Sequence, residues 1–368
     1  MWYNTRKGGD IMFTETKKVI ENAYLVGVTF SNKENVDLSL KELKSLCETA
    51  GLNVVGQDFQ MVRKVTPATL IGSGKIDEIK DELEKNNVNV VVFDYELSGS
   101  QVRNLSDIWG VKVIDRITLI LDIFAQRAQS REGKLQVELA QLKYNLPRLS
   151  GISGTSGRFG GSGVGMRGPG ETKLELDKRI AQNNILRLEK EIERVKQNRQ
   201  VQRKARQQNP IFKVAIVGYT NAGKSTLLNL ITKSSIYADD KLFATLDTTS
   251  RTVWLNEGNK FILTDTVGFI SKLPHNLVDA FSATLEEAKD ADLILHVIDA
   301  SNPYYKEQID VVDKVLDDLK ITSPIIKVYN KCDKLESKEQ TDGIYISAKN
   351  NIGIDDLKNA ILEKMSTM

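Results

Sequence analysis

The stretch of this chain that most constrains its fold is GYTNAGKS, residues Gly218 to Ser225. It fits the pattern G-x-x-x-x-G-K-[ST] and directly follows the apolar run Val214 to Val217. This order predicts a strand, a glycine-rich turn and the start of a helix. The inward-pointing backbone N–H groups of such a turn, with the positive end of the helix dipole, form a cradle for phosphate oxygens. Lys224 would then reach the β- and γ-phosphates, and the Ser225 hydroxyl would bind Mg²⁺.

Length and composition limit the class of protein. The 368 residues are enough for two or three domains, and no stretch approaches the ~20 apolar residues of a membrane span. The N-terminus lacks the apolar core of a signal peptide, so we expect a cytoplasmic protein with at most a peripheral membrane fraction. Cys47 and Cys332 lie far apart in sequence and suggest neither a metal cluster nor a disulfide framework.

Residues 1–115 are predicted to form a small α/β domain. Apolar runs indicate strands near residues 23–30, 52–62, 88–94 and 111–114, and helical patterns cover residues 37–50 and 76–83. The segment Gly72 to Lys75 resembles a truncated phosphate loop. Its spacing to a second glycine is wrong and no apolar strand directly precedes it, so we interpret it as a turn that starts a helix.

Residues 116–208 are predicted to form a basic, antiparallel helical hairpin. A helical pattern runs from Ile117 to Leu146 and stops at Pro147. A second long helix follows, because apolar residues recur every seven positions from Leu174 to Val195. The whole chain carries a net charge of only +2, but residues 127–209 hold 18 Lys and Arg against 8 Asp and Glu. This asymmetry indicates a polyanionic partner.

The segment between these two helices, residues 151–170, holds nine glycines and no acidic residue. Loops of this length are usually functional or serve as linkers. Free linkers are typically rich in glycine and serine alone, whereas this one interleaves Arg158, Phe159 and Arg167, with Arg148 just before it. Arginine suits phosphate recognition and a phenyl ring can stack on a base, so we expect these four residues to contact RNA. A passive linker, or a segment that folds over a nucleotide, stays an alternative.

Residues 209–368 alternate strands and helices in the way that is typical of a doubly wound, mainly parallel sheet. Residues 256–259 (Asn-Glu-Gly-Asn) join two short strands as a hairpin, which predicts one antiparallel edge strand. Two motifs, DTVG at residues 265–268 and NKCD at residues 330–333, follow predicted strands. Ligand sites in such folds form at the carboxyl ends of strands, so we expect both motifs to lie near the phosphate loop.

The chemistry of these motifs favours a guanine nucleotide. Asp265 can hold Mg²⁺ through water, and the Gly268 N–H can sense a γ-phosphate. The Asp333 carboxylate can accept from both the N1–H and the exocyclic amine of guanine, a pair of donors that adenine lacks. Residues 347–349 (Ser-Ala-Lys) would offer a backbone N–H to the guanine oxygen. Four motifs in this order therefore indicate GTP rather than ATP.

Four further stretches carry a resemblance to one family: FDYELSGSQVRNLSDI, DRITLILDIFAQRAQSREGKLQVELAQLKYNLPRL, GRFGGSGVGMRGPGETKLELDKR and LFATLD. With them the chain resembles the HflX family of translation-factor-like GTPases over roughly residues 20–366. The resemblance implies a GTPase that binds the large ribosomal subunit and its RNA and helps to split or recycle stalled ribosomes under stress. It also implies GTP hydrolysis that the ribosome stimulates. We expect a monomer with no integral membrane association.

By the same resemblance, residues 243–247 form the first switch segment and Thr245 is the second Mg²⁺ ligand, with Thr248 and Thr249 as competitors for that role. Phe269 stands where many small GTPases have a water-orienting glutamine, so we predict slow intrinsic hydrolysis.

The expected catalytic residues are Lys224, Thr245 and Gly268. The expected metal ligands are Ser225, Thr245 and, through water, Asp265. The expected nucleotide-binding residues are Gly218, Tyr219, Thr220, Asn221, Ala222, Gly223, Lys224, Ser225, Thr226, Phe243, Ala244, Thr245, Leu246, Asp247, Asp265, Thr266, Val267, Gly268, Asn330, Lys331, Asp333, Ser347, Ala348 and Lys349.

Two other functions are compatible with these motifs. The first is a non-ribosomal GTPase whose N-terminal region acts on tRNA, on a protein or at a membrane surface. The second is a nucleotide-gated module that remodels RNA, with ATP bound at the N-terminal domain. The incomplete phosphate loop at Gly72 to Lys75 gives the second little support.

Overall fold

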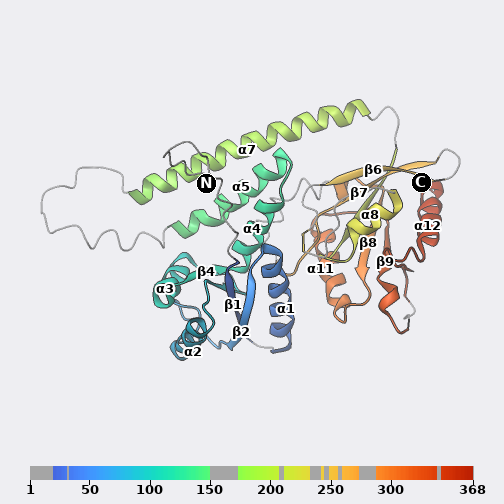
Figure 1. Cartoon of the computed structure of the whole chain (residues 1–368). Coiled ribbons are helices and arrows are strands. Elements are labelled where there is room, and N and C mark those ends of the chain that lie inside the picture. Colours follow the sequence, from blue (N-terminus) through green and yellow to red (C-terminus); the bar gives the residue numbers. More distant parts are fainter. Residues whose placement is uncertain are drawn as a thin grey trace, which may run out of the picture.

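The computed structural model describes residues 20–30, 33–149, 173–206, 211–232, 242–243, 248–255, 259–272, 287–337 and 341–367. Figure 1 shows two lobes, each built on its own β-sheet, with a pair of helices beside the N-terminal one. We call the first sheet with its covering helices the N-terminal lobe and the second the C-terminal lobe.

The N-terminal lobe has a four-stranded, all-parallel sheet in the order β2-β1-β3-β4. The strands are β1 (Asn22–Thr29), β2 (Asn53–Met61), β3 (Val90–Phe93) and β4 (Lys112–Asp115). The helices are α1 (Lys33–Ala50), α2 (Ser73–Lys85), α3 (Gly99–Trp109) and α4 (Arg116–Arg127). This arrangement confirms the predicted α/β lobe, and α2 begins where the Gly72 turn was expected to start a helix.

Both faces of this sheet are covered, because successive side chains of a strand point to opposite faces. Leu25 packs among residues of α1 and α4, such as Leu43 and Phe124. Its neighbour Val26 packs on the other face with residues of α2 and α3, such as Ile79. Such double burial explains why the strands are continuous apolar runs rather than alternating ones.

Helix α3 was not predicted, although a local signal for it exists. The Ser98 hydroxyl accepts from the Gln101 N–H, and the Gln101 side chain accepts from the Ser98 N–H. This reciprocal pair is a capping box, and the spacing Ser-x-x-Gln is its signature in sequence. The left-handed Gly110 (φ 68°) ends the helix.

The helical pair consists of α5 (Arg131–Asn145) and α7 (Lys173–Arg206), with the short 3₁₀ helix η1 (Leu146–Arg148) after α5. Figure 1 shows α7 lying along α5 and reaching on toward the C-terminal lobe. Leu139 of α5 packs against Leu188 and Ile192 of α7, which confirms the predicted hydrophobic seam.

The predicted single helix from Ile117 to Leu146 is wrong. Helix α4 ends at Arg127, and the Ser130 hydroxyl caps α5 by accepting from the Gly133 N–H at 2.9 Å. Because Ile117 and its apolar neighbours in α4 are buried in the N-terminal lobe, residues 116–127 lie with that lobe rather than with the hairpin.

The C-terminal lobe has a six-stranded sheet in the order β10-β9-β8-β5-β7-β6. The strands are β5 (Phe212–Gly218), β6 (Thr249–Trp254), β7 (Lys260–Asp265), β8 (Leu293–Asp299), β9 (Ile325–Asn330) and β10 (Ile344–Tyr345). The helical elements are α8 (Lys224–Thr232), α11 (Tyr305–Asp318), the 3₁₀ helix η2 (Cys332–Lys334) and α12 (Ile354–Thr367).

Only β6 runs antiparallel within the described strands of this sheet, and it lies at one edge. This confirms the doubly wound, mainly parallel fold with one antiparallel edge strand; the connecting residues 256–258 lie outside the described part. Helices α8 and α12 cover one face and α11 covers the other. Among the described residues, no helix combines the length and apolar character needed to cross a bilayer.

Candidate functional site

The phosphate loop lies between the end of β5 and the start of α8, as predicted from the GYTNAGKS motif. Gly218 and Gly223 of this loop cannot carry a side chain, because neighbouring residues approach their Cα atoms too closely. A Cβ on Gly218 would clash with the carbonyl oxygen of Val297 in β8, and one on Gly223 (φ +94°) would clash with the Asn330 side chain. These contacts hold the loop against the strands that carry the other motifs.

The ammonium group of Lys224 is turned back onto the loop. Its Nζ donates to the carbonyl oxygens of Gly218 at 3.1 Å and Tyr219 at 2.8 Å. Burial lowers the pKa of Lys224 to about 8, and the nearby Asp265 carboxylate only partly opposes this shift. A phosphate placed in the loop would supply the negative charge that this buried ammonium lacks.

Two hard oxygen donors meet beside the loop. The Ser225 hydroxyl donates to the Asp265 carboxylate at 2.7 Å, although the two residues are 40 positions apart in sequence. The next residue along, Thr266, is fixed because its hydroxyl donates to the carbonyl oxygen of Ile216 in β5. Hydroxyl and carboxylate oxygens are ligands that Mg²⁺ accepts.

The DTVG segment is closed onto the phosphate loop. The Thr220 N–H donates to the carbonyl oxygen of Phe269 at 2.8 Å, and the Phe269 N–H donates to the carbonyl oxygen of Gly218 at 3.1 Å. A Cβ on Gly268 would come within 2.9 Å of the Thr220 Cα and 2.8 Å of Lys224 Nζ, and the backbone contact cannot be relieved by a side-chain movement, so glycine is required here. The Phe269 side chain is buried, as an apolar ring should be, and offers no polar group at this position.

The NKCD motif supports the loop from the other side. The buried Asn330 amide donates to the carbonyl oxygen of Ala222 at 2.8 Å and accepts from the Ala348 N–H at 3.0 Å. Lys331 Nζ donates to the carbonyl oxygen of Asn221 at 2.9 Å and to Asp299 at 2.7 Å. Asn330 therefore ties the phosphate loop to the segment that was predicted to complete the base pocket.

Asp333 presents an exposed carboxylate at this edge of the sheet. It accepts from the buried Ser347 hydroxyl at 2.6 Å, and this hydrogen bond lowers the pKa of Asp333. The carboxylate is thus ionised and oriented, as an acceptor for two base donors must be. The structure brings the four predicted motifs together at the carboxyl ends of β5, β7, β9 and β10.

Phe243 lies elsewhere than expected. Its buried ring packs edge-on against Phe124 of α4 with 4.6 Å between centroids, and the adjacent Leu242 N–H donates to Thr49 of α1. In this structure the ring therefore packs between the lobes, and the nucleotide contact of Phe243 stays a prediction. Residues 244–247, which include Thr245, lie outside the described part of the chain.

A cluster of polar residues that was not predicted joins the two lobes. The Tyr219 hydroxyl, from the phosphate loop, donates to Glu42 of α1 and accepts from the Ser271 N–H at 2.7 Å. The Ser271 hydroxyl also donates to Glu42, and Arg116 pairs with the same carboxylate. We call Glu42, Asp94, Arg116, Tyr219, Ser271 and Lys272 the interlobe cluster.

The cluster is centred on Arg116, whose side chain is only 2% exposed. Its guanidinium donates to Asp94 at 2.8 Å, and the same carboxylate accepts from Lys272 Nζ at 2.6 Å. Burial alone would lower the pKa of Arg116, but Glu42 and Asp94 raise it above its ordinary value. The two residues after Ile270, Ser271 and Lys272, are therefore held by the N-terminal lobe directly beside the DTVG segment.

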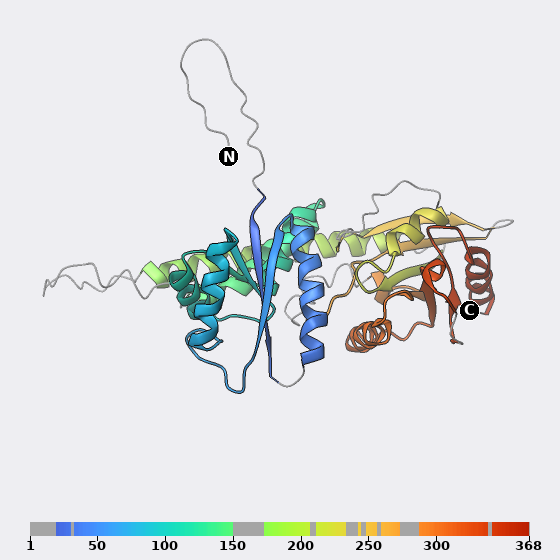
Figure 2. The same ribbon diagram turned by 60° about the horizontal axis from the view of Figure 1, so that its bottom comes forward.

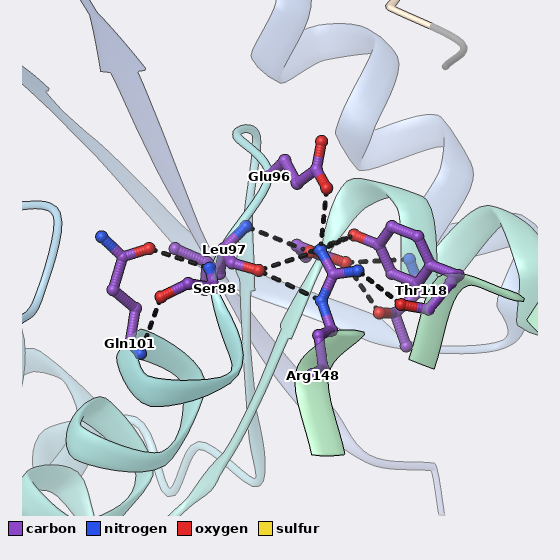
Figure 3. A network of polar contacts seen from close by, with 8 residues as sticks. Glu96, Leu97, Ser98, Gln101, Thr118 and Arg148 are labelled. Atoms are coloured by element: carbon purple, nitrogen blue, oxygen red, sulfur yellow. Dashed lines mark hydrogen bonds and ion pairs between the residues drawn. The ribbon is translucent and has the colours of Figure 1, made fainter. Parts of the chain in front are cut away.

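Arg148 also lies elsewhere than expected. Its guanidinium donates to the carbonyl oxygens of Leu97 and Tyr144 and pairs with Glu96 and Asp115. Figure 3 shows Arg148 with Leu97 and Glu96. It also stacks over the Tyr144 ring, 3.4 Å from the centroid. These internal partners argue against the predicted RNA contact, since they occupy most of the five donors of the guanidinium. Arg158, Phe159 and Arg167 lie outside the described residues.

Comparison with known proteins covers almost the whole chain. Residues 37–125 match the family model "GTP-binding GTPase N-terminal", residues 127–206 match "GTP-binding GTPase Middle Region" and residues 213–331 match "50S ribosome-binding GTPase". A GTP-binding protein from the archaeon Sulfolobus solfataricus, solved in complex with GDP, is 26% identical with a TM-score of 0.50. That likeness covers 95% of this chain and 99% of the archaeal one.

Curated relatives named GTPase HflX are closer in sequence. The protein of Caldanaerobacter subterraneus subsp. tengcongensis is 53% identical over 96% of this chain and 82% of its own length. The Escherichia coli protein is 42% identical over 94% of this chain and 83% of its own length. With the four GTP motifs assembled at one edge of the sheet, these matches show that the chain belongs to the HflX family and is a GTPase.

Proposed function

We propose that this GTPase binds the large ribosomal subunit in its GTP state and acts in splitting, recycling or rescuing stalled ribosomes under stress. The observation that carries the proposal is the match of residues 213–331 to a family described as 50S ribosome-binding GTPases. The excess of positive charge in residues 127–209 supports it, because ribosomal RNA is a polyanion.

Mg²⁺ is part of the proposal. Ser225 and Asp265 fit a hard cation because their oxygens lie 2.7 Å apart beside the phosphate loop, and Thr245 would complete the protein ligands. When bound, Mg²⁺ neutralises charge on the β- and γ-phosphate oxygens. Lys224 would bind the same phosphates through its ammonium, and the Gly268 N–H would contact the γ-phosphate.

Co-sedimentation with purified ribosomal subunits tests the central claim. We expect the protein to pellet with large subunits when it carries a non-hydrolysable GTP analogue and to remain largely in the supernatant with GDP. Small subunits serve as the control polyanion, because they carry ribosomal RNA of the same charge density. Absence of large-subunit binding in both nucleotide states would rule out the ribosomal role and favour a non-ribosomal GTPase.

The proposal includes slow intrinsic hydrolysis. Phe269 supplies no polar atom to orient water, and its backbone is held between Gly218 and Thr220. We expect the rate of phosphate release to rise when large subunits are added. Equal rates with and without subunits would contradict this part of the proposal and leave the binding claim intact.

We also propose that Arg158, Phe159 and Arg167 contact ribosomal RNA. Replacing both arginines with glutamine should weaken binding and flatten its dependence on salt, because each phosphate contact releases counterions. Arg131→Gln is the matched control, since Arg131 pairs with Glu191 at 2.5 Å on the hairpin. An unchanged salt slope in the double variant would assign residues 151–170 to a linker.

A further inference from the structure

The strands β1 and β2 extend farther than the rest of the N-terminal sheet. Strand β1 pairs with β2 up to Thr29 opposite Met61, but it pairs with β3 only from Ala23 to Val26. Figure 2 shows these two blue strands as the long pair of the sheet, next to α1. Their carboxyl ends therefore project beyond β3, at the edge where α/β sheets place their ligands.

Apolar side chains are exposed at this projecting edge. Phe30 follows β1 and Tyr95 follows β3, and their rings meet edge to face with 5.5 Å between centroids. Phe30 is 44% exposed and Tyr95 is 39% exposed, and Val65, in the segment that follows β2, is also 39% exposed. Grouped exposure of large apolar side chains on a soluble protein marks an interaction site more often than single exposed residues do.

The charges around these rings are positive. Arg63 and Lys64, which directly follow the end of β2, are both exposed. The carboxylates on either side of Tyr95 are already neutralised, because Asp94 pairs with Arg116 and Lys272 and Glu96 pairs with Arg148. We call Phe30, Arg63, Lys64, Val65 and Tyr95 the strand-end patch.

The backbone that carries this patch is firmly held. After β2, the carbonyl oxygen of Thr66 accepts from the Gln101 amide and that of Ala68 accepts from the Asn104 amide at 2.9 Å, both from α3. The carbonyl oxygen of Thr29 accepts from the Val62 N–H at 2.8 Å. The exposed rings and cations are therefore displayed on a fixed frame, which lowers the entropy lost when a ligand binds.

We propose that the strand-end patch binds single-stranded RNA, with unpaired bases stacked on Phe30 and Tyr95 and phosphates on Arg63 and Lys64. Aromatic rings beside exposed cations are the combination that single strands need, because every base has a face to stack and every nucleotide has a phosphate. A duplex offers no unstacked base to the rings. The inference rests on the proposed ribosomal role and adds a second contact surface, separate from the hairpin.

Binding of a fluorescein-labelled 12-nucleotide oligouridine to the full chain tests the proposal. We expect the double variant Phe30→Ala/Tyr95→Ala to bind at least tenfold more weakly, as lost stacking requires. The variant Phe30→Tyr/Tyr95→Phe keeps both rings and should bind within twofold of the wild type.

Trp254→Ala is the control for non-specific base stacking, because it removes a 68% exposed aromatic ring from the C-terminal lobe. Wild-type affinity in the Phe30→Ala/Tyr95→Ala protein, with its circular dichroism unchanged, would overturn the proposal.

The salt dependence of oligouridine binding measures the contribution of Arg63 and Lys64 separately from that of the rings. Each phosphate contact on a single strand contributes about 0.7 to the slope of log K against log salt, so Arg63→Gln/Lys64→Gln should reduce the slope by about 1.4. This variant removes no apolar surface, and a slope equal to that of the wild type would overturn the assignment of phosphates to the patch.

A cross-linking residue distinguishes RNA from protein as the occupant. A photoreactive phenylalanine analogue in place of Val65 should, in ribosome mixtures, give a product that ribonuclease shortens. A product that ribonuclease leaves intact and that contains a ribosomal protein would overturn the RNA assignment. Dependence of oligouridine binding on the patch, together with failure to bind large subunits, would uphold this inference while the ribosomal role falls.

Discussion

Asp333 is the residue on which the choice of base depends. Its carboxylate is exposed and held by Ser347, so it can accept two hydrogen bonds from guanine. Asp333→Asn replaces one acceptor with a donor, which suits the 2-oxo group of xanthine. We expect the affinity for GTP to fall at least tenfold and that for XTP to rise, since hydrogen bonds to charged groups contribute about 1.5–3 kcal/mol each. Competition against a fluorescent GDP measures both.

The matched control for that change is Asp342→Asn. Asp342 pairs with Lys327 at 3.3 Å, and its side chain is exposed. It should leave both affinities unchanged. Equal loss of GTP and XTP binding in the Asp333 variant would mean that the residue supports the fold of the pocket rather than reading the base.

Lys224 predicts a pH dependence of nucleotide binding. Its pKa is lowered to about 8, so the nucleotide-free protein loses this proton as pH rises through 8, whereas phosphates bind the ammonium form. Binding at pH 8.5 should therefore take up most of one proton, while binding at pH 7 should take up little at this group. Calorimetry in two buffers of different ionisation enthalpy measures the uptake. Lys224→Arg, which stays charged, should show no such difference between the two pH values.

At the level of elements, Arg148 fixes the end of the helical hairpin to the N-terminal lobe. It joins η1 to Leu97, just before α3, and to Asp115, which caps α4 by accepting from the Thr118 N–H. A Cβ on Gly99 would clash with the Arg148 carbonyl oxygen, so α3 begins directly against this residue. The orientation of the hairpin thus depends on one guanidinium and the buried carboxylate that it faces.

Arg148→Ala should lower the free energy of unfolding of this part of the molecule by about 2–4 kcal/mol, because it leaves the Asp115 carboxylate buried with fewer partners. Arg131→Ala is the control. Arg131 is 79% exposed and its ion pair with Glu191 should contribute less than about 1 kcal/mol. Urea denaturation followed by far-ultraviolet circular dichroism measures both. Equal midpoints for the two variants would show that the Arg148 contacts contribute no more than a surface pair.

The elements that could be predicted from sequence are those with local signals. The phosphate loop and the NKCD motif carry their chemistry within a few residues, and their strands are apolar runs, so both were placed correctly. The break between α4 and α5 was missed because the apolar pattern continues through Ala128 and only the Ser130 cap marks the new helix. Helix α3 was missed although its capping box was present in the sequence.

At the level of the whole molecule, the interlobe cluster could not have been predicted. Glu42 lies 74 residues before Arg116 in sequence and 177 before Tyr219, and no motif links them. The packing of Phe243 against Phe124 could not be predicted for the same reason, since the two residues belong to different lobes. Contacts of this kind depend on how the surfaces of the two lobes meet, which no local sequence pattern records.

Glu42→Gln tests what the cluster does. The change keeps the shape of the side chain but removes the negative charge that Arg116 faces. We therefore expect the segment around Ser271 to separate from the N-terminal lobe more often. Hydrogen exchange of the peptide containing the Ser271 amide should become roughly tenfold faster, in line with the loss of a charge-assisted hydrogen bond. Mass spectrometry of deuterium uptake in the nucleotide-free protein measures this rate.

Two further variants make that measurement specific. Tyr219→Phe removes only the hydroxyl that accepts from the Ser271 N–H at 2.7 Å and should accelerate the same peptide. Glu48→Gln, at an exposed position of the same helix, should not change it. Unchanged exchange in both the Glu42 and Tyr219 variants would show that other contacts hold the segment in place.

Tyr219 belongs to two binding equilibria at once. Its carbonyl oxygen accepts from Lys224 inside the phosphate loop, and its hydroxyl contacts Glu42 of the other lobe. Linkage is reciprocal: if a bound nucleotide stabilises the docking of the two lobes, docking must strengthen nucleotide binding by the same free energy. If the coupling free energy between nucleotide binding and lobe docking is about 1.4 kcal/mol, a partner that separates the lobes changes nucleotide affinity tenfold without contacting the nucleotide.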